Sequence, residues 1–191
     1  MKVVKKAQHA PVTMEDVIAM IKNSNGTPEG FPNFYFYGPV LCGKTRAAHE
    51  IARALGQDDC YNKAKSQYWR RYNGEKVVLI DDLKQDDGQY IQNYLLNWAK
   101  PYRFNVTVEG YKERVKNDDG RITFIEKDIK EERIDPTQYV LVLTSTKKPD
   151  AVFKFDLEDQ ERFEKLFNVI EITPDFFEKK DKRKSKADME N

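Results

Sequence analysis

The sequence predicts an α/β fold in which helices flank a mostly parallel central sheet. Apolar runs without polar alternation occur at Asn33–Tyr37, Lys76–Ile80 and Tyr139–Leu143, and such runs are typical of strands that are covered on both faces. Segments with helical spacing of apolar residues lie between them, and strands that alternate with helices favour a parallel sheet. We expect a fourth strand at Val169–Ile172.

Two helices are expected within this region, and a third precedes it. Arg46–Leu55 ends at Gly56, a residue that often terminates helices, and Gln89–Ala99 repeats apolar residues at helical spacing. Near the N-terminus, Thr13 stands before two acidic residues, as a helix-capping threonine does.

Length and composition exclude several classes of protein. A chain of 191 residues with a net charge of +1 is one ordinary domain without a bulk preference for anionic partners. Cys42 and Cys60 are too few for a disulfide framework, and no apolar run approaches the roughly 20 residues of a membrane span. We therefore expect an intracellular protein without a membrane segment. Trp69 and Trp98 are expected in the core.

A phosphate-binding loop is predicted directly after the first strand. Gly38–Thr45 is a complete Gly-x-x-x-x-Gly-Lys-Thr pattern, and it stands between a strand and a helix, which is the context that this motif requires. Its glycines permit a tight turn with inward N–H groups, and the following helix points its positive end at the same place. The residues expected to contact a nucleoside triphosphate are Gly38, Pro39, Val40, Leu41, Cys42, Gly43, Lys44, Thr45 and Arg46.

An acidic pair at the end of the second strand completes the expected site. Lys44 would reach the β- and γ-phosphates of ATP, and Thr45 would hold Mg²⁺. Asp81 would bind the same Mg²⁺ through water, and Asp82 would polarise the attacking water. Two adjacent carboxylates at the end of a buried strand are costly unless a cation is near.

The third strand ends in hydroxyl side chains, Thr144-Ser145-Thr146. One of them is expected to contact the γ-phosphate or the attacking water. A polar strand end without such a role is the alternative.

Together these motifs resemble the superfamily 3 helicases of small viruses, and most of all the ATPase domain of circovirus-type Rep proteins. The resemblance covers about residues 31–173 and includes the aromatic and Gly–Glu segment Tyr68–Glu75, the acidic pair and the third strand end. Pro101–Glu109 is similar to a further motif of that family, which opens a β-hairpin. Picornavirus-like helicases are more distant relatives.

The resemblance implies an AAA+-like hexameric ring that hydrolyses ATP and moves along single-stranded nucleic acid, with DNA favoured. In the family the third strand usually ends in asparagine, whereas this chain has Thr146, which we assign as the sensor with Ser145 as the alternative. The family supplies an arginine from the neighbouring subunit, and we assign this role to Arg162, with Lys165 as the alternative. Viral replication of this kind would place the protein in the host nucleus or the cytoplasm.

A charged hairpin is expected between Phe104–Val108 and Arg121–Ile125. Lys112, Arg114 and Lys116 would carry positive charge near its turn, where cations contact phosphates without selecting a base sequence. The alternative is a solvated hairpin whose acidic residues cancel this charge.

Two other functions compete with the helicase. A GTPase switch is suggested by Lys147–Asp150 after a buried strand, although its first residue is lysine and no Asp-x-x-Gly follows the second strand. An assembly module without activity is opposed by the intact Lys44, Thr45, Asp81 and Asp82. We divide the chain into a helical segment and linker (1–30, a possible oligomerisation collar), an ATPase domain (31–175) and a basic tail (176–191).

Overall fold

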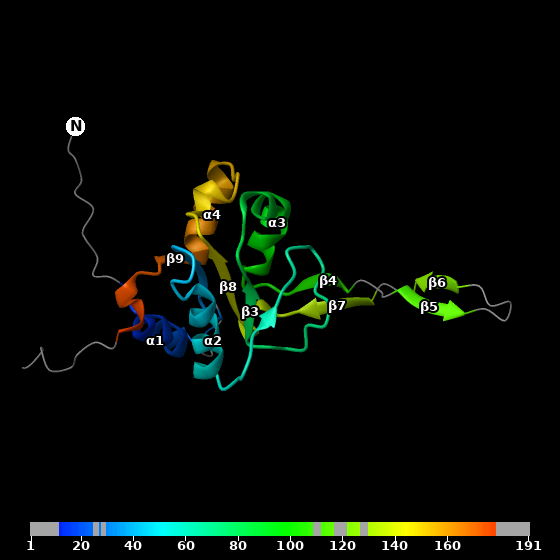
Figure 1. The fold of residues 1–191 in the computed structure, drawn as a ribbon, viewed down its shortest axis with the longest axis horizontal. Helices are drawn as coiled ribbons and strands as arrows, with labels where there is room; N and C mark the ends of the chain where they lie inside the picture. The colour runs from blue at the N-terminus through cyan, green and yellow to red at the C-terminus, as the bar shows by residue number, and fades with distance from the viewer. Residues whose placement is uncertain are drawn as a thin grey trace, which may run out of the picture.

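The computed structural model describes residues 12–24, 27, 30–108, 112–116, 122–126 and 130–178. Its centre is a fully parallel sheet with the strand order β2-β3-β8-β1-β9 (Figure 1). The predicted α/β fold is thus confirmed. The strands are β1 (Asn33–Tyr37), β2 (Tyr61–Asn62), β3 (Val77–Ile80), β8 (Val140–Ser145) and β9 (Phe167–Glu171).

Alternating side chains of β1 explain why this strand has no polar face. Phe34 and Phe36 are fully buried on one side of the sheet, whereas Tyr35 is fully buried on the other. Helices α1 (Met14–Ser24) and α2 (Lys44–Ala54) cover the first side, and α3 (Gln85–Trp98) and α4 (Leu157–Leu166) cover the second. Because both faces are covered, both sets of side chains must be apolar.

Helix α3 begins four residues before the predicted start at Gln89. Gly88 is part of the helix and packs so closely on Val152 that an added Cβ would lie 2.5 Å from its side chain. The early start is stabilised because the Asp87 carboxylate accepts a hydrogen bond from the backbone N–H of Lys84 (3.1 Å). Trp69 and Trp98 are buried, as predicted.

Helix α1 uses its apolar face within the chain. Met14, Val17 and Ile21 are buried, and the helix packs against α2 and the short helix η3 (Pro174–Phe177). The expected threonine cap is present, because Thr13 Oγ1 accepts a hydrogen bond from Asp16 N (3.4 Å). Amphipathicity therefore no longer supports an oligomerisation collar, which stays a prediction.

The ordered domain extends beyond its predicted end at residue 175. Phe176 is buried against Phe36, with 5.9 Å between the ring centroids, and Phe177 lies beside the phosphate-binding loop. The assignment of residues 176–178 to a tail is therefore corrected, since these two rings pack on the domain. Residues 179–191 lie outside the described residues.

The hairpin prediction was wrong in its pairing. β4 (Phe104–Val108) pairs with β7 (Lys130–Ile134), and a second antiparallel ladder joins β5 (Lys112–Lys116) to β6 (Ile122–Glu126). Figure 1 shows the β4–β7 pair beside the central sheet and the β5–β6 pair farther away from it. Lys112, Arg114 and Lys116, which were predicted near the turn, belong to strand β5 instead.

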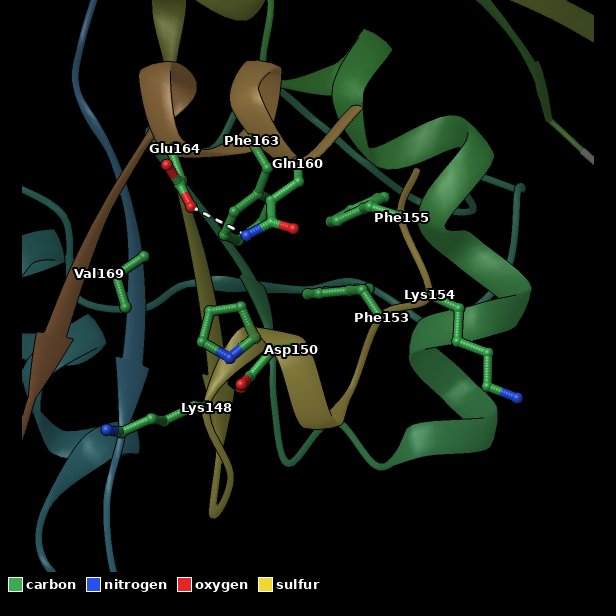
Figure 2. Close-up of a pocket in the computed structure, with 10 residues that line it drawn as sticks. Lys148, Asp150, Phe153, Lys154, Phe155, Gln160, Phe163, Glu164 and Val169 are labelled. Carbon is green, nitrogen blue, oxygen red and sulfur yellow. Dashed lines mark hydrogen bonds between the residues drawn. The ribbon is translucent and has the colours of Figure 1, made fainter. Parts of the chain in front are cut away.

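A cavity of about 840 Å³ lies between α4 and the segment that follows β8 (Figure 2). Phe153, Phe155 and Phe163 line it, together with charged side chains that include Lys148 and Glu164. The short helices η1 (Pro136–Gln138) and η2 (Pro149–Ala151) precede and follow β8. Within the described part of the chain, no helix is long and apolar enough to cross a bilayer.

Candidate functional site

The loop between β1 and α2 has the backbone geometry that its glycines allow. Gly43, directly before α2, has a left-handed φ of 99°, and a Cβ added there would lie 2.5 Å from a ring carbon of Phe177. Only glycine satisfies both conditions without strain. Val40 and Leu41, at the outside of the loop, are 75% and 97% exposed.

Lys44 fills the inside of this loop. Its side chain is buried, and Nζ donates to the carbonyl oxygens of Gly38 (3.0 Å) and Pro39 (2.7 Å). A buried ammonium group requires such acceptors, and the loop supplies them from its own backbone. The loop is therefore shaped around one positive charge.

Thr45, at the start of α2, lies next to Asp81, which follows β3. Thr45 Oγ1 lies 3.1 Å from Oδ1 and 3.0 Å from Oδ2 of Asp81. The two residues are 36 positions apart in the sequence, and the parallel sheet brings them together. Their oxygen atoms belong to the ligand types that Mg²⁺ prefers.

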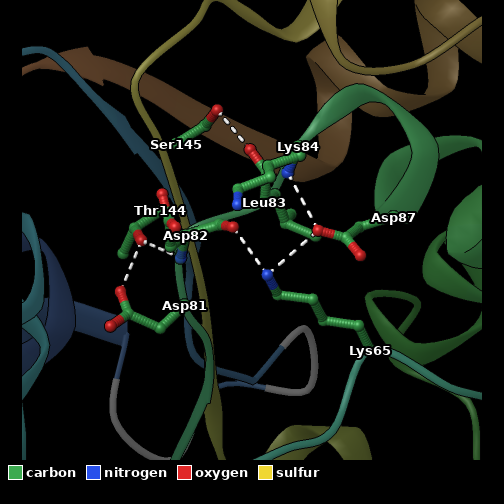
Figure 3. A network of polar contacts seen from close by, with 8 residues as sticks. All are labelled: Lys65, Asp81, Asp82, Leu83, Lys84, Asp87, Thr144 and Ser145. Carbon is green, nitrogen blue, oxygen red and sulfur yellow. Dashed lines mark hydrogen bonds and ion pairs between the residues drawn. The ribbon is translucent and has the colours of Figure 1, made fainter.

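Thr144 at the end of β8 makes a contact with the acidic pair that the sequence analysis did not predict. Its buried hydroxyl donates to Asp81 Oδ1 (2.5 Å) and accepts from the backbone N–H of Asp82 (2.8 Å), as Figure 3 shows. The strand register would have indicated it. Ile80 pairs with Leu143, so the residues that follow them, Asp81 and Thr144, lie level.

The two hydroxyl residues assigned as possible sensors lie elsewhere. Ser145 is buried, and its hydroxyl donates to the carbonyl oxygen of Leu83 (2.7 Å), which holds the turn after the acidic pair. Thr146 is exposed just beyond the strand. The sensor role of Thr146 stays a prediction.

Parts of this chain are similar in sequence to a helicase family and to two viral proteins. A profile of the RNA helicase family matches residues 34–120, which include the loop and the acidic pair. The replication-associated protein of Human associated cyclovirus 1 is 33% identical over 78 residues, which cover 40% of this chain and 27% of that protein. The replication-associated protein of Beak and feather disease virus is 27% identical over 148 residues, 73% of this chain and 41% of that protein.

These matches support the resemblance to the superfamily 3 helicases of circovirus Rep type that was stated from the motifs. The chain spans less than half the length of each viral relative that it matches.

Arg162 and Lys165, the two candidates for the residue supplied to a neighbouring subunit, lie on α4. Arg162 forms ion pairs with Glu158 and with Asp159 (3.2 Å), both on the same helix. Lys165 is exposed on the last turn. The structure does not bring either residue to the phosphate-binding loop, and a residue that serves a neighbouring subunit need not lie there.

The candidate nucleic-acid residues Lys112, Arg114 and Lys116 all belong to β5. Their backbone pairs with β6, from Lys112 opposite Glu126 to Lys116 opposite Ile122. Their side chains lie outside what the structure describes, so the nucleic-acid contact stays a prediction.

Two other features lie apart from the loop. The cavity beside α4 has none of residues 38–46 in its described lining. On α2, His49 Nδ1 lies 3.4 Å from Asp59 Oδ1 and 4.0 Å from Cys60 Sγ. Burial raises the pKa of the Cys60 thiol to about 11, so the thiol is protonated at neutral pH. We assign no role to either feature.

Proposed function

We propose that this chain is an ATP-hydrolysing helicase domain that acts in a hexameric ring on single-stranded DNA during viral or plasmid genome replication. The observation that carries the proposal is the contact of Thr45 with Asp81, next to a loop that already holds the Lys44 ammonium group. The Rep-type family supports a replication-associated helicase function, and the ring and the DNA track are parts of the proposal.

The loop would bind the triphosphate of ATP through its backbone N–H groups and through Lys44. The carbonyl oxygens of Gly38 and Pro39 hold the ammonium group close to the loop centre. Phosphate oxygens can replace these carbonyls as acceptors, since a phosphate carries charge and makes stronger bonds with an ammonium group. Lys44 then needs only a small movement to reach the β- and γ-phosphates.

Thr45 and Asp81 would hold the Mg²⁺ that accompanies ATP. The fit rests on the chemistry of the donors, a hydroxyl and a carboxylate within 3.1 Å of each other at the exposed end of the loop. Bound Mg²⁺ would neutralise charge on the phosphates. The short bond from Thr144 fixes the Asp81 carboxylate, so the metal ligand does not have to be ordered when nucleotide binds.

Asp82 is proposed to orient and polarise the attacking water. Its side chain is exposed at the same strand end, one residue beyond the metal ligand. Thr146 would contact the γ-phosphate or this water. Arg162, or Lys165 as the alternative, would reach the site of the next subunit and stabilise charge as the phosphoryl group leaves.

The test is Mg²⁺-dependent ATP turnover by the purified chain and by Lys44→Ala. We expect Lys44→Ala to reduce kcat/KM at least about 100-fold, because it removes the only cation that the loop encloses. Lys22→Ala, on the exposed side of α1, is the matched control and should retain full turnover. Unchanged hydrolysis by Lys44→Ala would remove the loop from the mechanism.

The helicase part of the proposal needs a second measurement. Electron microscopy of the chain with single-stranded DNA and a non-hydrolysable ATP analogue should show six-membered rings. ATP turnover without rings, with no stimulation by single-stranded DNA, would favour the nucleotide switch. A strict requirement for GTP in the turnover assay would have the same meaning.

A further inference from the structure

Lys65 makes two polar contacts beside the acidic pair. It lies between β2 and β3, and its half-buried side chain donates through Nζ to the backbone carbonyl of Asp82 (2.6 Å) and to Asp87 Oδ2 (3.0 Å) (Figure 3). These partners are 17 and 22 positions away in the sequence. These two hydrogen bonds hold the Lys65 side chain in one place between the acidic pair and α3.

Asp82 has a backbone conformation that requires such support. Its φ of 50° lies in the left-handed region, which is strained for a residue with a Cβ. Side chains from two other segments hold its peptide groups, because Thr144 Oγ1 accepts from its N–H (2.8 Å) and Lys65 donates to its carbonyl. The direction of the Asp82 side chain is set by this backbone conformation.

Asp87 makes Lys65 a fixed support. The carboxylate lies in the first turn of α3 and also accepts from the backbone N–H of Lys84 (3.1 Å). Although desolvation by burial raises the pKa of Asp87, the hydrogen bonds from Lys65 and Lys84 outweigh it and lower that pKa below its ordinary value. The second partner of Lys65 is thus an ionised group anchored to a helix.

We propose that Lys65 is a positioning residue for ATP hydrolysis, which holds Asp82 in its left-handed conformation so that the carboxylate faces the attacking water. The inference rests on the proposed function, because it assigns a support to one of its residues. The Lys65 ammonium group is bonded to Asp82 and Asp87, and in Figure 3 it lies on the opposite side of Asp82 from Asp81. It should therefore affect the chemical step and leave the binding of Mg²⁺ and ATP unchanged.

The simpler explanation is an ion pair that stabilises the start of α3. The two explanations predict different kinetics. A stabilising pair would change the melting temperature and leave the turnover of the folded protein intact, whereas a positioning residue would lower kcat at constant KM.

The experiment compares Lys65→Met, Lys65→Arg and the control Lys154→Met in steady-state ATP hydrolysis. Methionine keeps the length of the side chain and removes its donors, and Lys154 is an exposed lysine outside the Lys65–Asp82–Asp87 contacts. We expect Lys65→Met to lower kcat about tenfold with KM for ATP within about twofold, and Lys65→Arg to stay within about threefold of the unmodified chain. The control should match the unmodified chain.

Hydrogen exchange provides a second readout that does not need activity. The amide of Asp82 donates to the hydroxyl of Thr144 (2.8 Å), and the amide of Leu83 donates to the carbonyl oxygen of Thr144 (2.8 Å). Lys65→Met should speed the exchange of these two amides, while the amides of β1 stay protected.

Full kcat in Lys65→Met, with an active unmodified chain, would overturn the inference and leave the proposed function standing. An inactive unmodified chain would instead defeat the proposed function. In that case the exchange rates decide the structural half of the inference, and unchanged exchange at Asp82 and Leu83 would overturn it.

Discussion

The polar groups at the ends of β3 and β8 and in the loop after β1 differ from Arg162 on α4 in their partners. At the strand ends, Lys44, Thr45, Asp81 and Thr144 are bonded to one another or to the loop backbone. On α4, the ion pairs of Arg162 with described residues are with acids of its own helix. The first group is held by contacts between separate elements of the chain, whereas Arg162 is paired locally.

This difference indicates which functions a single chain can perform. Groups that bind a ligand gain from being ordered in advance, because less ordering is needed when the ligand arrives. Groups that act on a neighbouring subunit or on DNA have to be exposed, and surface ion pairs with their own helix are weak enough to be exchanged. The comparison therefore separates nucleotide binding by one chain from steps that need a second molecule.

The largest expected effect that tests this comparison concerns the residue supplied by the neighbour. Arg162→Ala should reduce ATP turnover about 100-fold, because a trans-acting arginine stabilises charge in the transition state. It should leave ATP binding unchanged, since Arg162 does not contact the loop. Turnover and equilibrium binding of a fluorescent ATP analogue are the measurements.

Mixing two inactive variants determines whether the residue acts between chains. In mixed rings, Lys44→Ala subunits would supply Arg162 to the intact loops of Arg162→Ala subunits, so part of the activity should return. Lys165→Ala serves as the matched variant on the same helix. If Arg162→Ala alone is fully active and Lys165→Ala is not, the role belongs to Lys165.

The strand-end site is tested by the hydroxyl of Thr144. Thr144→Val keeps the shape of the side chain but removes the bond to Asp81 and leaves the N–H of Asp82 unpaired. We expect about a tenfold loss of kcat/KM for MgATP and about 1–3 kcal/mol lower stability from the unpaired donor. Turnover and urea unfolding measure the two effects.

Thr144→Ser is the control for this prediction, because serine retains the hydroxyl and loses only a methyl group. It should keep most of the turnover. Equal losses in the valine and serine variants would show that packing, and not the hydroxyl, explains the effect.

The parts of the molecule that were predicted correctly depend on local patterns. The strand, loop and helix around Gly38–Thr45 follow one another in one continuous segment, and the apolar runs of β1, β3 and β8 are visible without knowing their neighbours. Lys65 and the contacts of Thr144 with the acidic pair were not predicted, because they join residues that lie 17 to 63 positions apart. Such contacts require the register of the sheet, which a list of strands does not contain.

The hairpin was also mispredicted because the pairing of its strands is not visible in the sequence. The charged residues of β5 were placed near the turn of the predicted hairpin, and the partner of β4 was placed too early in the sequence, at Arg121–Ile125 instead of Lys130–Ile134. The structure replaces one hairpin by two successive ladders. Only cross-strand pairing distinguishes such a ladder from a long charged loop.

The predicted contact of β5 with single-stranded DNA is tested by the salt dependence of DNA binding. Replacing Lys112, Arg114 and Lys116 by glutamine should weaken single-stranded DNA binding and reduce the slope of log K against log salt by roughly 2, at about 0.7 per phosphate contact. Fluorescence anisotropy at several salt concentrations gives this slope. The same replacement of Lys179, Lys180 and Lys182 in the basic tail is the matched control, and an equal change there would assign the binding to general charge.

A smaller effect, on the pH dependence of stability, is expected from Lys63. This lysine is buried away from the loop after β1. Its ammonium group donates to the carbonyls of Ala64, Ser66 and Tyr68 and lies over the rings of Trp69 and Trp98. Desolvation by burial lowers its pKa from 10.5 to about 7, and the carbonyls and rings oppose this shift because they favour the charged form.

The direction of the pH effect follows from that lowered pKa. Between pH 7 and pH 10 the unfolded chain would hold a proton on Lys63 that the folded chain has released, so the free energy of unfolding should rise with pH, by at most about 1.4 kcal/mol per unit. Urea unfolding at pH 7, 8 and 9 measures it. Lys63→Met should remove this rise, and Lys76→Met, on an exposed lysine that donates to Leu55, should retain it. A flat profile in the unmodified chain would mean that the three carbonyls and two rings keep Lys63 charged throughout.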